Sequence, residues 1–147
     1  MNNIHSLAAV LFNLIPILDR EFVHPIDQKF RNIINPSQLL ILKILCIKEF
    51  SMTDLAFACG MSKQQLTPLI KKMDRQHFIE RKYIPEDRRI IRIAITDTGR
   101  NMLEEIHKYT VQILEEKLSA LEEKDRKKLS VSLTSVYEIF SRENIFK

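Results

Sequence analysis

Amide and basic side chains are concentrated between residues 61 and 92. This stretch contains nine Lys/Arg and four Asp/Glu, a local balance of +5, whereas the whole 147-residue chain carries only +4. Glutamine amides can form paired hydrogen bonds to base edges, and Lys and Arg side chains can neutralise phosphates. A basic patch confined to one segment predicts a polyanionic partner, and double-stranded DNA fits it best.

A helix predicted over residues 63–77 would position most of these groups. Ser62 and Gln65 have the spacing of a capping box, which marks the start of a helix. At about 100° per residue, apolar residues gather on one side (Leu66, Leu69, Ile70 and Met73). The other side is polar or basic, and we assign base reading to Gln64, Gln65 and Thr67, and contacts with the DNA backbone to Lys63, Lys71, Lys72 and Arg75. A simply solvated helix face would have a similar composition.

Pro68 falls inside this predicted helix, on its outer face. A proline there removes one backbone hydrogen bond and crowds the preceding turn. We therefore predict a kink or a distorted first turn.

Two short strands are predicted at 79–84 and 90–95, because apolar residues alternate there with polar ones. They are joined by Pro85-Glu86-Asp87-Arg88-Arg89. The Asp87 carboxylate could orient Arg88 or Arg89 by a charge-assisted hydrogen bond, and an oriented arginine at a loop tip suits the narrow minor groove of DNA. A solvated turn is the alternative interpretation.

The segment before the basic helix has the pattern of a helix-turn-helix. Helix starts at Asn35 and Ser51 predict helices near 36–48 and 52–59. Ala56, Gly60 and Leu66 then provide a small contact residue, a left-handed turn and an apolar anchor. Two ordinary packed helices could share this spacing. The order of helix, turn, helix and basic hairpin describes a winged helix-turn-helix.

Apolar faces dominate the two flanking regions. A helix over 4–22 is expected to be kinked or split at Pro16, and 24–34 is expected to be a looser connection. Helices at 98–121, after Thr96-Asp97, and at 123–141 follow the hairpin. Little within one subunit would cover these faces, which is typical of interfaces.

Composition narrows the class of protein further. Two glycines and 45% hydrophobic residues suit a mainly α fold with a small β wing. Cys46 and Cys59 lie in apolar runs, so we expect core thiols, no disulfide and a cytoplasmic protein. The apolar stretch 7–18 is shorter than the ~20 residues of a membrane span. His5, His24, His77 and His107 lack the spacing of metal ligands, so neither a metal nor a cofactor is expected.

By its residues, the chain resembles the MarR family of transcription regulators. The specific resemblance runs from Ser62 to Gly99 and includes Ile79-Glu80-Arg81, the wing residues 85–89 and Ile95-Thr96-Asp97-Thr98-Gly99. It implies that Arg89 is the minor-groove arginine, that Asp87 orients it, and that the helix from Ser62 is the recognition helix. Pro68 and His77-Phe78 depart from the family pattern.

The resemblance also implies a domain organisation. The whole chain, 1–147, would form a single MarR-like domain, in which 35–97 is the DNA-binding lobe and 1–34 with 98–147 is the helical dimerisation region. A small apolar or phenolic effector would bind between them, with Phe12, Phe22, His24 and Phe30 as candidate pocket residues. Core packing would explain these four residues equally well.

Three functional hypotheses follow. The first is a homodimeric, sequence-specific DNA-binding regulator, a repressor on a pseudo-palindromic operator that a small molecule releases. The alternative is a winged-helix module that contacts proteins. An enzyme is not expected, because the sequence contains no phosphate-binding glycine loop, no His-Glu-x-x-His and no nucleophile elbow.

Overall fold

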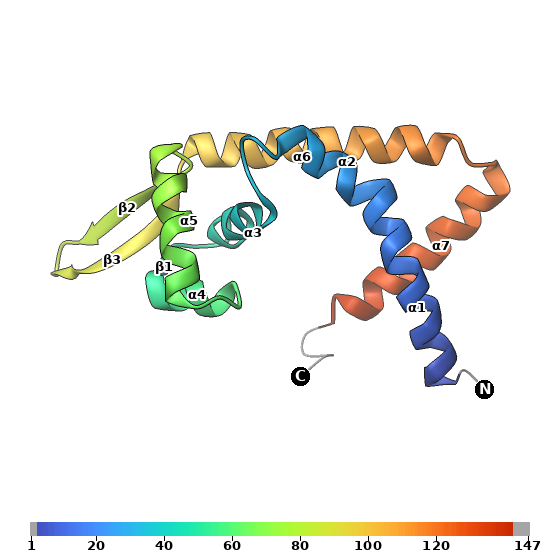
Figure 1. The fold of residues 1–147 in the computed structure, drawn as a ribbon, viewed down its shortest axis with the longest axis horizontal. Coiled ribbons are helices and arrows are strands. Elements are labelled where there is room, and N and C mark those ends of the chain that lie inside the picture. Colours follow the sequence, from blue (N-terminus) through green and yellow to red (C-terminus); the bar gives the residue numbers. More distant parts are fainter. Residues whose placement is uncertain (1–2, 143–147) are drawn as a thin grey trace. The chain divides into compact units, whose positions relative to one another are not determined.

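The computed structural model describes residues 3–142, except the side chains of residues 88 and 90 (Figure 1). The chain divides into two compact units, residues 1–110 and 111–147, with the boundary inside the long helix α6 (Asp97–Ser119). Helices with one small sheet make up the described elements, which confirms a mainly α fold with a β wing. Within these residues, no helix combines the length and the apolar character that crossing a bilayer requires.

The N-terminal arm belongs to the first unit. Helix α1 (Ile4–Leu18) runs through Pro16 and is followed by a π-helical turn, η1 (Asp19–Val23). In this turn the backbone N–H of His24 donates to the Asp19 carbonyl, five residues earlier. The helical geometry therefore changes three residues after Pro16 rather than at the proline itself.

Helix α2 (His24–Phe30) follows directly, so the expected loose connection over 24–34 is wrong for its first seven residues. The physical reason is the place of Pro25. A proline in the first turn of a helix loses no intrahelical hydrogen bond, because the first N–H groups have no partner within the helix. Pro25 therefore begins a helix here instead of breaking one.

The three helix starts predicted before the hairpin are confirmed. Helices α3 (Pro36–Leu45), α4 (Met52–Ala58) and α5 (Lys63–Arg75) each follow a residue whose side-chain oxygen accepts a hydrogen bond from the backbone N–H three residues on. These bonds, made by Asn35, Ser51 and Ser62, are 2.9–3.1 Å long. Each satisfies a backbone donor that the helix itself leaves unpaired.

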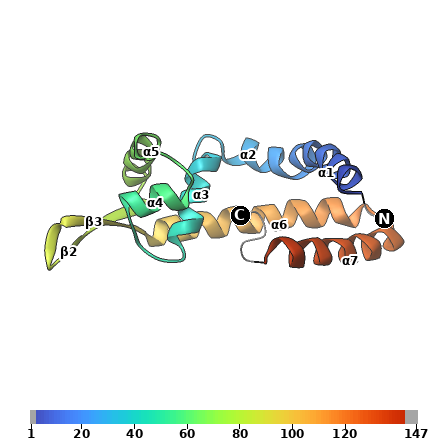
Figure 2. The ribbon, with the colours of Figure 1, turned by 90° about the horizontal axis from the view of Figure 1, so that it is seen from below.

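A three-stranded antiparallel sheet has the order β1-β3-β2. Strands β2 (Ile79–Ile84) and β3 (Asp87–Ile95) form the predicted hairpin, which extends beyond the helices of its unit (Figure 2). Strand β3 begins at Asp87, earlier than predicted, so only Pro85 and Glu86 form the turn. Strand β1 (Phe50–Ser51) was not predicted, since two residues are too few for a periodic pattern.

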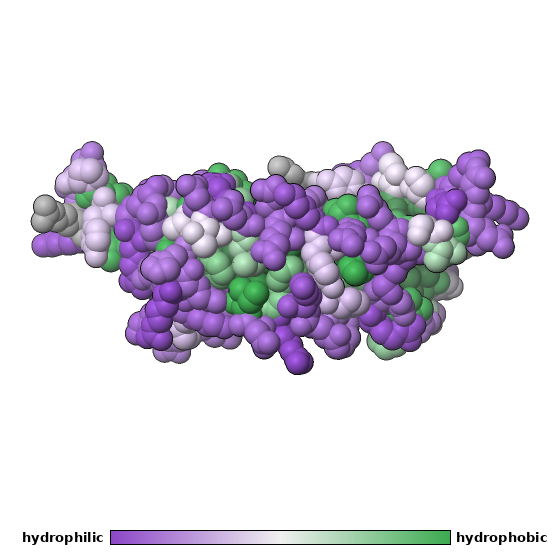
Figure 3. Space-filling model, turned by 90° about the horizontal axis from the view of Figure 1, so that it is seen from above, coloured by the Kyte–Doolittle hydropathy of each residue, from purple (hydrophilic) through white to green (hydrophobic). Residues whose placement is uncertain are grey.

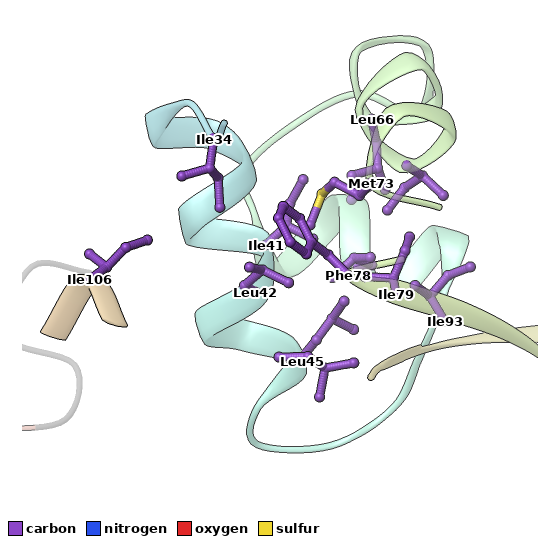
Figure 4. Packing of buried hydrophobic residues seen from close by; sticks show 14 of the residues in the cluster. Ile34, Ile41, Leu42, Leu45, Leu66, Met73, Phe78, Ile79, Ile93 and Ile106 are labelled. Carbon is purple, nitrogen blue, oxygen red and sulfur yellow. The ribbon is translucent and has the colours of Figure 1, made fainter. Parts of the chain in front are cut away.

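The core of the first unit is formed by α3, α4, α5 and the sheet (Figure 4). Its most buried side chains, with no exposed surface, are Ile41, Leu42, Leu55, Leu66, Ile70, Met73 and Ile93. Phe30 joins this core from α2 and meets the Tyr109 ring edge-on, with 5.5 Å between the ring centroids. The core thus connects the end of the N-terminal arm to the winged helix.

The junction between β3 and α6 is held by Thr96. Its backbone N–H donates to the Phe78 carbonyl (3.1 Å), and its hydroxyl donates to the His77 carbonyl (2.5 Å) and accepts from the Gly99 N–H (3.1 Å). The first turn of α6 is therefore tied to the residues that follow α5.

His77 takes a left-handed backbone conformation, with φ of 59°. Its N–H donates to the Asp74 carbonyl and the Phe78 N–H donates to the Met73 carbonyl, both at 3.0 Å. These two bonds form the Schellman motif, which normally places a glycine at this position. An L-residue in this conformation is strained by about 1–2 kcal/mol.

Replacing His77 with Gly is expected to raise the free energy of unfolding by about 0.5–1 kcal/mol. The gain is smaller than the strain because glycine loses more backbone entropy on folding. Urea denaturation followed by circular dichroism measures it. His77→Ala, which retains the strain, should leave stability near that of the wild type, and a Gly variant less stable than this control would contradict the prediction.

The second unit contains the end of α6 and helix α7 (Glu123–Phe140). One guanidinium nitrogen of Arg126, Nη1, donates to the carbonyls of Ser119 (3.1 Å) and Leu121 (2.9 Å), which satisfies backbone acceptors at the end of α6. No residue of α7 is buried. Its predicted apolar seam (Leu129, Leu133, Val136 and Phe140) is half-buried at Leu129 and exposed at the other three positions.

Candidate nucleic-acid interface

Helix α5 separates its residues into two faces, as predicted. Leu66, Ile70 and Met73 have no exposed surface, and Leu69 is half-buried against the same core. The predicted contact residues on the opposite face and its flanks are all exposed (Lys63, Gln64, Gln65, Thr67, Lys71, Lys72 and Arg75). The helix therefore presents amides and cations to solvent while its apolar side fixes it to the lobe.

Two of the polar side chains on this face form hydrogen bonds within α5 itself or with its cap. The Gln65 side-chain oxygen accepts from the Ser62 backbone N–H (2.9 Å), which completes the capping box. The Thr67 hydroxyl donates to the Lys63 carbonyl (2.7 Å). Gln64 differs, since its side chain makes no hydrogen bond within the described part of the chain. Among the three predicted base readers, Gln64 is the one with its whole amide available.

Pro68 does not disturb the first turn of this helix. Helix α5 continues through it as one α-helix, and the capping box before it is complete (Figure 1). Of the two predicted effects, a kink or a distorted first turn, the distorted first turn is therefore wrong. Because Pro68 lies on the exposed face, solvent can hydrogen-bond the Gln64 carbonyl, which a proline cannot serve.

The turn between α4 and α5 has the geometry that the sequence predicts. Gly60 has φ of 63°. Its N–H donates to the Phe57 carbonyl (3.1 Å), and the Met61 N–H donates to the Ala56 carbonyl (2.9 Å). Ala56 is 4% exposed, so a small side chain lies in the core next to the turn. These bonds fix the direction in which α5 leaves α4.

The tip of the hairpin is organised by Asp87. Its carboxylate accepts from the backbone N–H of Arg89 (3.0 Å), and the Arg89 side chain is exposed. A shift in strand register between Tyr83 and Ile84 precedes the turn. Asp87 therefore holds the backbone of Arg89, whereas the predicted bond was to an arginine guanidinium, and the side chain of Arg88 lies outside the described structure.

Three acidic residues engage cations at the base of the hairpin. Lys82 Nζ lies 2.5 Å from Glu49 Oε1 and 3.6 Å from Glu80 Oε1, and the hydrogen bond to Glu49 raises the pKa of Lys82. Arg81 Nε lies 3.6 Å from Asp74 Oδ2. Sequence reasoning counted both cations in the basic patch but missed their partners. Glu49 lies 33 residues from Lys82, beyond any local pattern.

The four candidate pocket residues lie in different environments. Phe30 is 4% exposed in the core, whereas Phe12 is 76% exposed on α1. Phe22 is half-buried in η1 and His24 is exposed, with its ring nitrogen 3.0 Å from the Gln28 side chain. Core packing therefore accounts for Phe30. A cavity of about 330 Å³ occurs instead in the second unit, lined by Leu118, Arg126, Leu129, Ser130, Leu133 and Thr134.

The cysteines differ from the core thiols that were expected. Cys46, at the end of α3, is exposed, and its sulfur lies 3.5 Å from a guanidinium nitrogen of Arg100. Cys59 is half-buried against the core, and desolvation raises the pKa of its thiol. Within residues 3–142, the structure groups no three His, Cys, Asp or Glu side chains around a point where a metal ion could bind.

Comparison with known proteins gives the same fold. Residues 34–91 match the MarR family. MepR, a transcription regulator of the Staphylococcus aureus multidrug efflux pump MepA, superimposes with a TM-score of 0.72 at 20% identity, over 87% of this chain and 96% of MepR. A MepR variant bound to an oligodeoxyribonucleotide gives 0.70 at 20% identity, over 89% and 98%.

A protein from another organism provides a third similar structure. The transcriptional regulator BldR from Sulfolobus solfataricus superimposes with a TM-score of 0.62 at 23% identity, over 94% of this chain and 99% of BldR. No curated protein matches the sequence. The similarity to these solved structures covers nearly the whole chain, and it concerns the winged-helix fold.

Proposed function

We propose, from the match of residues 34–91 to the MarR family, that the chain is a sequence-specific DNA-binding transcription regulator. It acts as a homodimer on a pseudo-palindromic operator, represses transcription there, and is released by a small apolar or phenolic molecule. The observation that carries the proposal is the exposed amide and basic face of α5, which is held beside a hairpin with an arginine at its tip.

The residues of α5 have distinct roles in the proposed complex. Gln64 can form two hydrogen bonds to an adenine edge in the major groove, because its amide makes no hydrogen bond to the residues that the structure describes. Gln65 and Thr67 can each still offer one group to a base, since the cap and the helix carbonyl occupy only the other. Lys63, Lys71, Lys72 and Arg75 are placed to contact phosphates.

The hairpin would enter the minor groove beside the recognition helix. The bond from the Arg89 N–H to Asp87 fixes the backbone at the tip, so less conformational entropy is lost when Arg89 binds. The negative potential of a narrow minor groove attracts an exposed guanidinium. Arg89 therefore adds affinity and a preference for narrow grooves.

Dimerisation is supported by the apolar surface that single helices expose. No residue of α1 or α7 is buried. Ile4, Phe12, Val131 and Tyr137 are each at least 70% exposed, and hydrophobic residues appear between hydrophilic ones on the surface (Figure 3). Apolar faces of this kind are stabilised by a second copy. A twofold dimer would then place its two recognition helices about one DNA turn, ~10 bp, apart.

Salt dependence tests whether DNA binding is the function. If several phosphates are neutralised, the logarithm of the affinity falls linearly with the logarithm of the salt concentration. The slope of this line becomes steeper by about 0.9 for each phosphate that is neutralised. Fluorescence anisotropy with a labelled duplex between about 50 and 200 mM salt should show a loss of at least tenfold. A flat response would favour the protein-interaction module instead.

A further inference from the structure

A chain of hydrogen bonds joins the end of α5 to the segment between α2 and α3. The Gln76 side-chain nitrogen donates to the Ile33 carbonyl (2.6 Å), and its oxygen accepts from the Gln38 side-chain nitrogen (3.0 Å). The Gln38 oxygen accepts from the Asn35 backbone N–H (3.2 Å). Two amide side chains thus connect segments that are 43 and 38 residues apart in the sequence.

The backbone groups at the two ends determine how both amides are oriented. The Asn35 N–H requires the oxygen of Gln38, so the nitrogen of Gln38 points to Gln76. The nitrogen of Gln76 is then left for the Ile33 carbonyl, which can only accept. Flipping either amide would place two donors or two acceptors against each other. The arrangement is therefore specific in direction as well as position.

Burial makes the Gln38 part of this chain of hydrogen bonds sensitive to displacement, whereas the bond between Gln76 and Ile33 is exposed. Gln38 has no exposed surface and is the buried polar residue of the described core. A buried amide that loses its partner costs about 1–3 kcal/mol, and hydrogen bonds weaken steeply once they lengthen beyond their normal range. A movement of the 31–35 segment must therefore either break these hydrogen bonds or move the end of α5 with it.

The residues that follow α5 have a second attachment, to α6. The carbonyls of His77 and Phe78 accept from the hydroxyl and the N–H of Thr96. Residues 76–78 thus tie the end of α5 both to the segment after α2 and to the first turn of α6. The other end of α5 is held by its own local cap at Ser62.

We propose that Gln76 and Gln38 form a polar latch that sets the orientation of α5 from the position of the segment 31–35. Gln76 is a positioning residue, because it acts through the helix that carries Gln64, Lys71 and Arg75. A displacement of α2, by a ligand or by a second copy of the chain, reaches the DNA-facing surface through this latch. The inference rests on the proposed DNA-binding function and adds a regulatory route to it.

The test compares Gln76→Met, Gln38→Met and the double variant in the full-length protein. Affinity for the selected operator should fall about tenfold in each single variant, as expected for about one lost hydrogen bond per copy of a dimer. Affinity for a random duplex should change less than about twofold, because the phosphate contacts remain. The double variant should lose no more operator affinity than the single variant that binds more weakly, since the two residues act as one unit.

Hydrogen exchange of backbone amides is the readout that does not need DNA. In Gln76→Met, exchange should accelerate together in the last turn of α5 and in residues 31–35. Gln28→Met, which removes an exposed amide from α2, should change neither exchange nor affinity. If Gln76→Met does not fold, Gln76→Glu can replace that variant in the test. The glutamate retains the hydrogen bond from Gln38 and loses the one to the Ile33 carbonyl.

Two results would overturn the latch. One is an unchanged preference for operator over random duplex in the single variants. The other is accelerated exchange in only one of the two segments. If the wild-type protein showed no preference for any duplex, the proposed function would fail, and the exchange measurement would still decide whether the two segments are coupled.

Discussion

Replacing Arg89 with Glu is expected to weaken operator binding about a hundredfold or more at ~0.1 M salt. The change turns an attraction into a repulsion at the wing tip, and in a homodimer it does so twice. The Asp87 carboxylate accepts from the backbone N–H of Arg89, so the geometry of the turn should survive the substitution. Gel shifts on operator DNA measure the loss, together with a shallower dependence on salt.

Lys124→Glu is the matched control for this variant. Lys124 is exposed near the start of α7, and its reversal changes the net charge by the same amount as the reversal of Arg89. A carboxylate in the first turn of a helix is also favourable, so folding should be retained. If both variants lost affinity equally, the effect would come from total charge, and the specific role of the wing would be contradicted.

Replacing Gly99 with Ala is expected to lower the free energy of unfolding by about 2–3 kcal/mol. A Cβ atom at this position would lie 2.2 Å from the Phe78 carbonyl oxygen and 2.8 Å from Ile95 Cγ1. Relief requires α6 to move away from Phe78, which would break the hydrogen bond between Thr96 and that carbonyl. The higher helix propensity of alanine, about 1 kcal/mol, offsets only part of this cost.

The other glycine of the chain provides the control, because it is needed for a different reason. A Cβ on Gly60 would meet nothing within 4 Å, and only its φ of 63° disfavours a side chain. Gly60→Ala should therefore cost about 1 kcal/mol. Urea denaturation of both variants compares the two effects. A smaller loss for Gly99→Ala than for Gly60→Ala would show that α6 can shift without cost.

Sequence periodicity predicted the elements whose signals are local. Helix α5 could be predicted because its capping box and its apolar face both lie within 63–75. Gly60 could be predicted because a left-handed turn after a short helix favours glycine. The same applies to the hairpin, where Ile91, Ile93 and Ile95 alternate along β3 with Arg92 and Ala94.

Features that depend on distant partners could not be predicted in this way. Gln38 completes the capping box of α3, three residues after Asn35, but its second hydrogen bond reaches Gln76, 38 residues away. The exposure of Cys46 depends on how α3 ends against the rest of the lobe, and apolar neighbours in the sequence suggested the opposite. In the same way, the predicted pocket residues shared apolar character, which does not distinguish the buried Phe30 from the exposed Phe12.

Selection of bound duplexes from a random pool tests the central claim most directly. A twofold pair of exposed α5 faces predicts enrichment of an inverted repeat, with half-sites centred about 10 bp apart and each flanked by a narrow minor groove. The Gln64→Ala protein should enrich the same spacing with a relaxed base preference inside each half-site. Recovery of sequences without any common motif, or of a single unrepeated half-site, would contradict the account of a dimeric DNA reader.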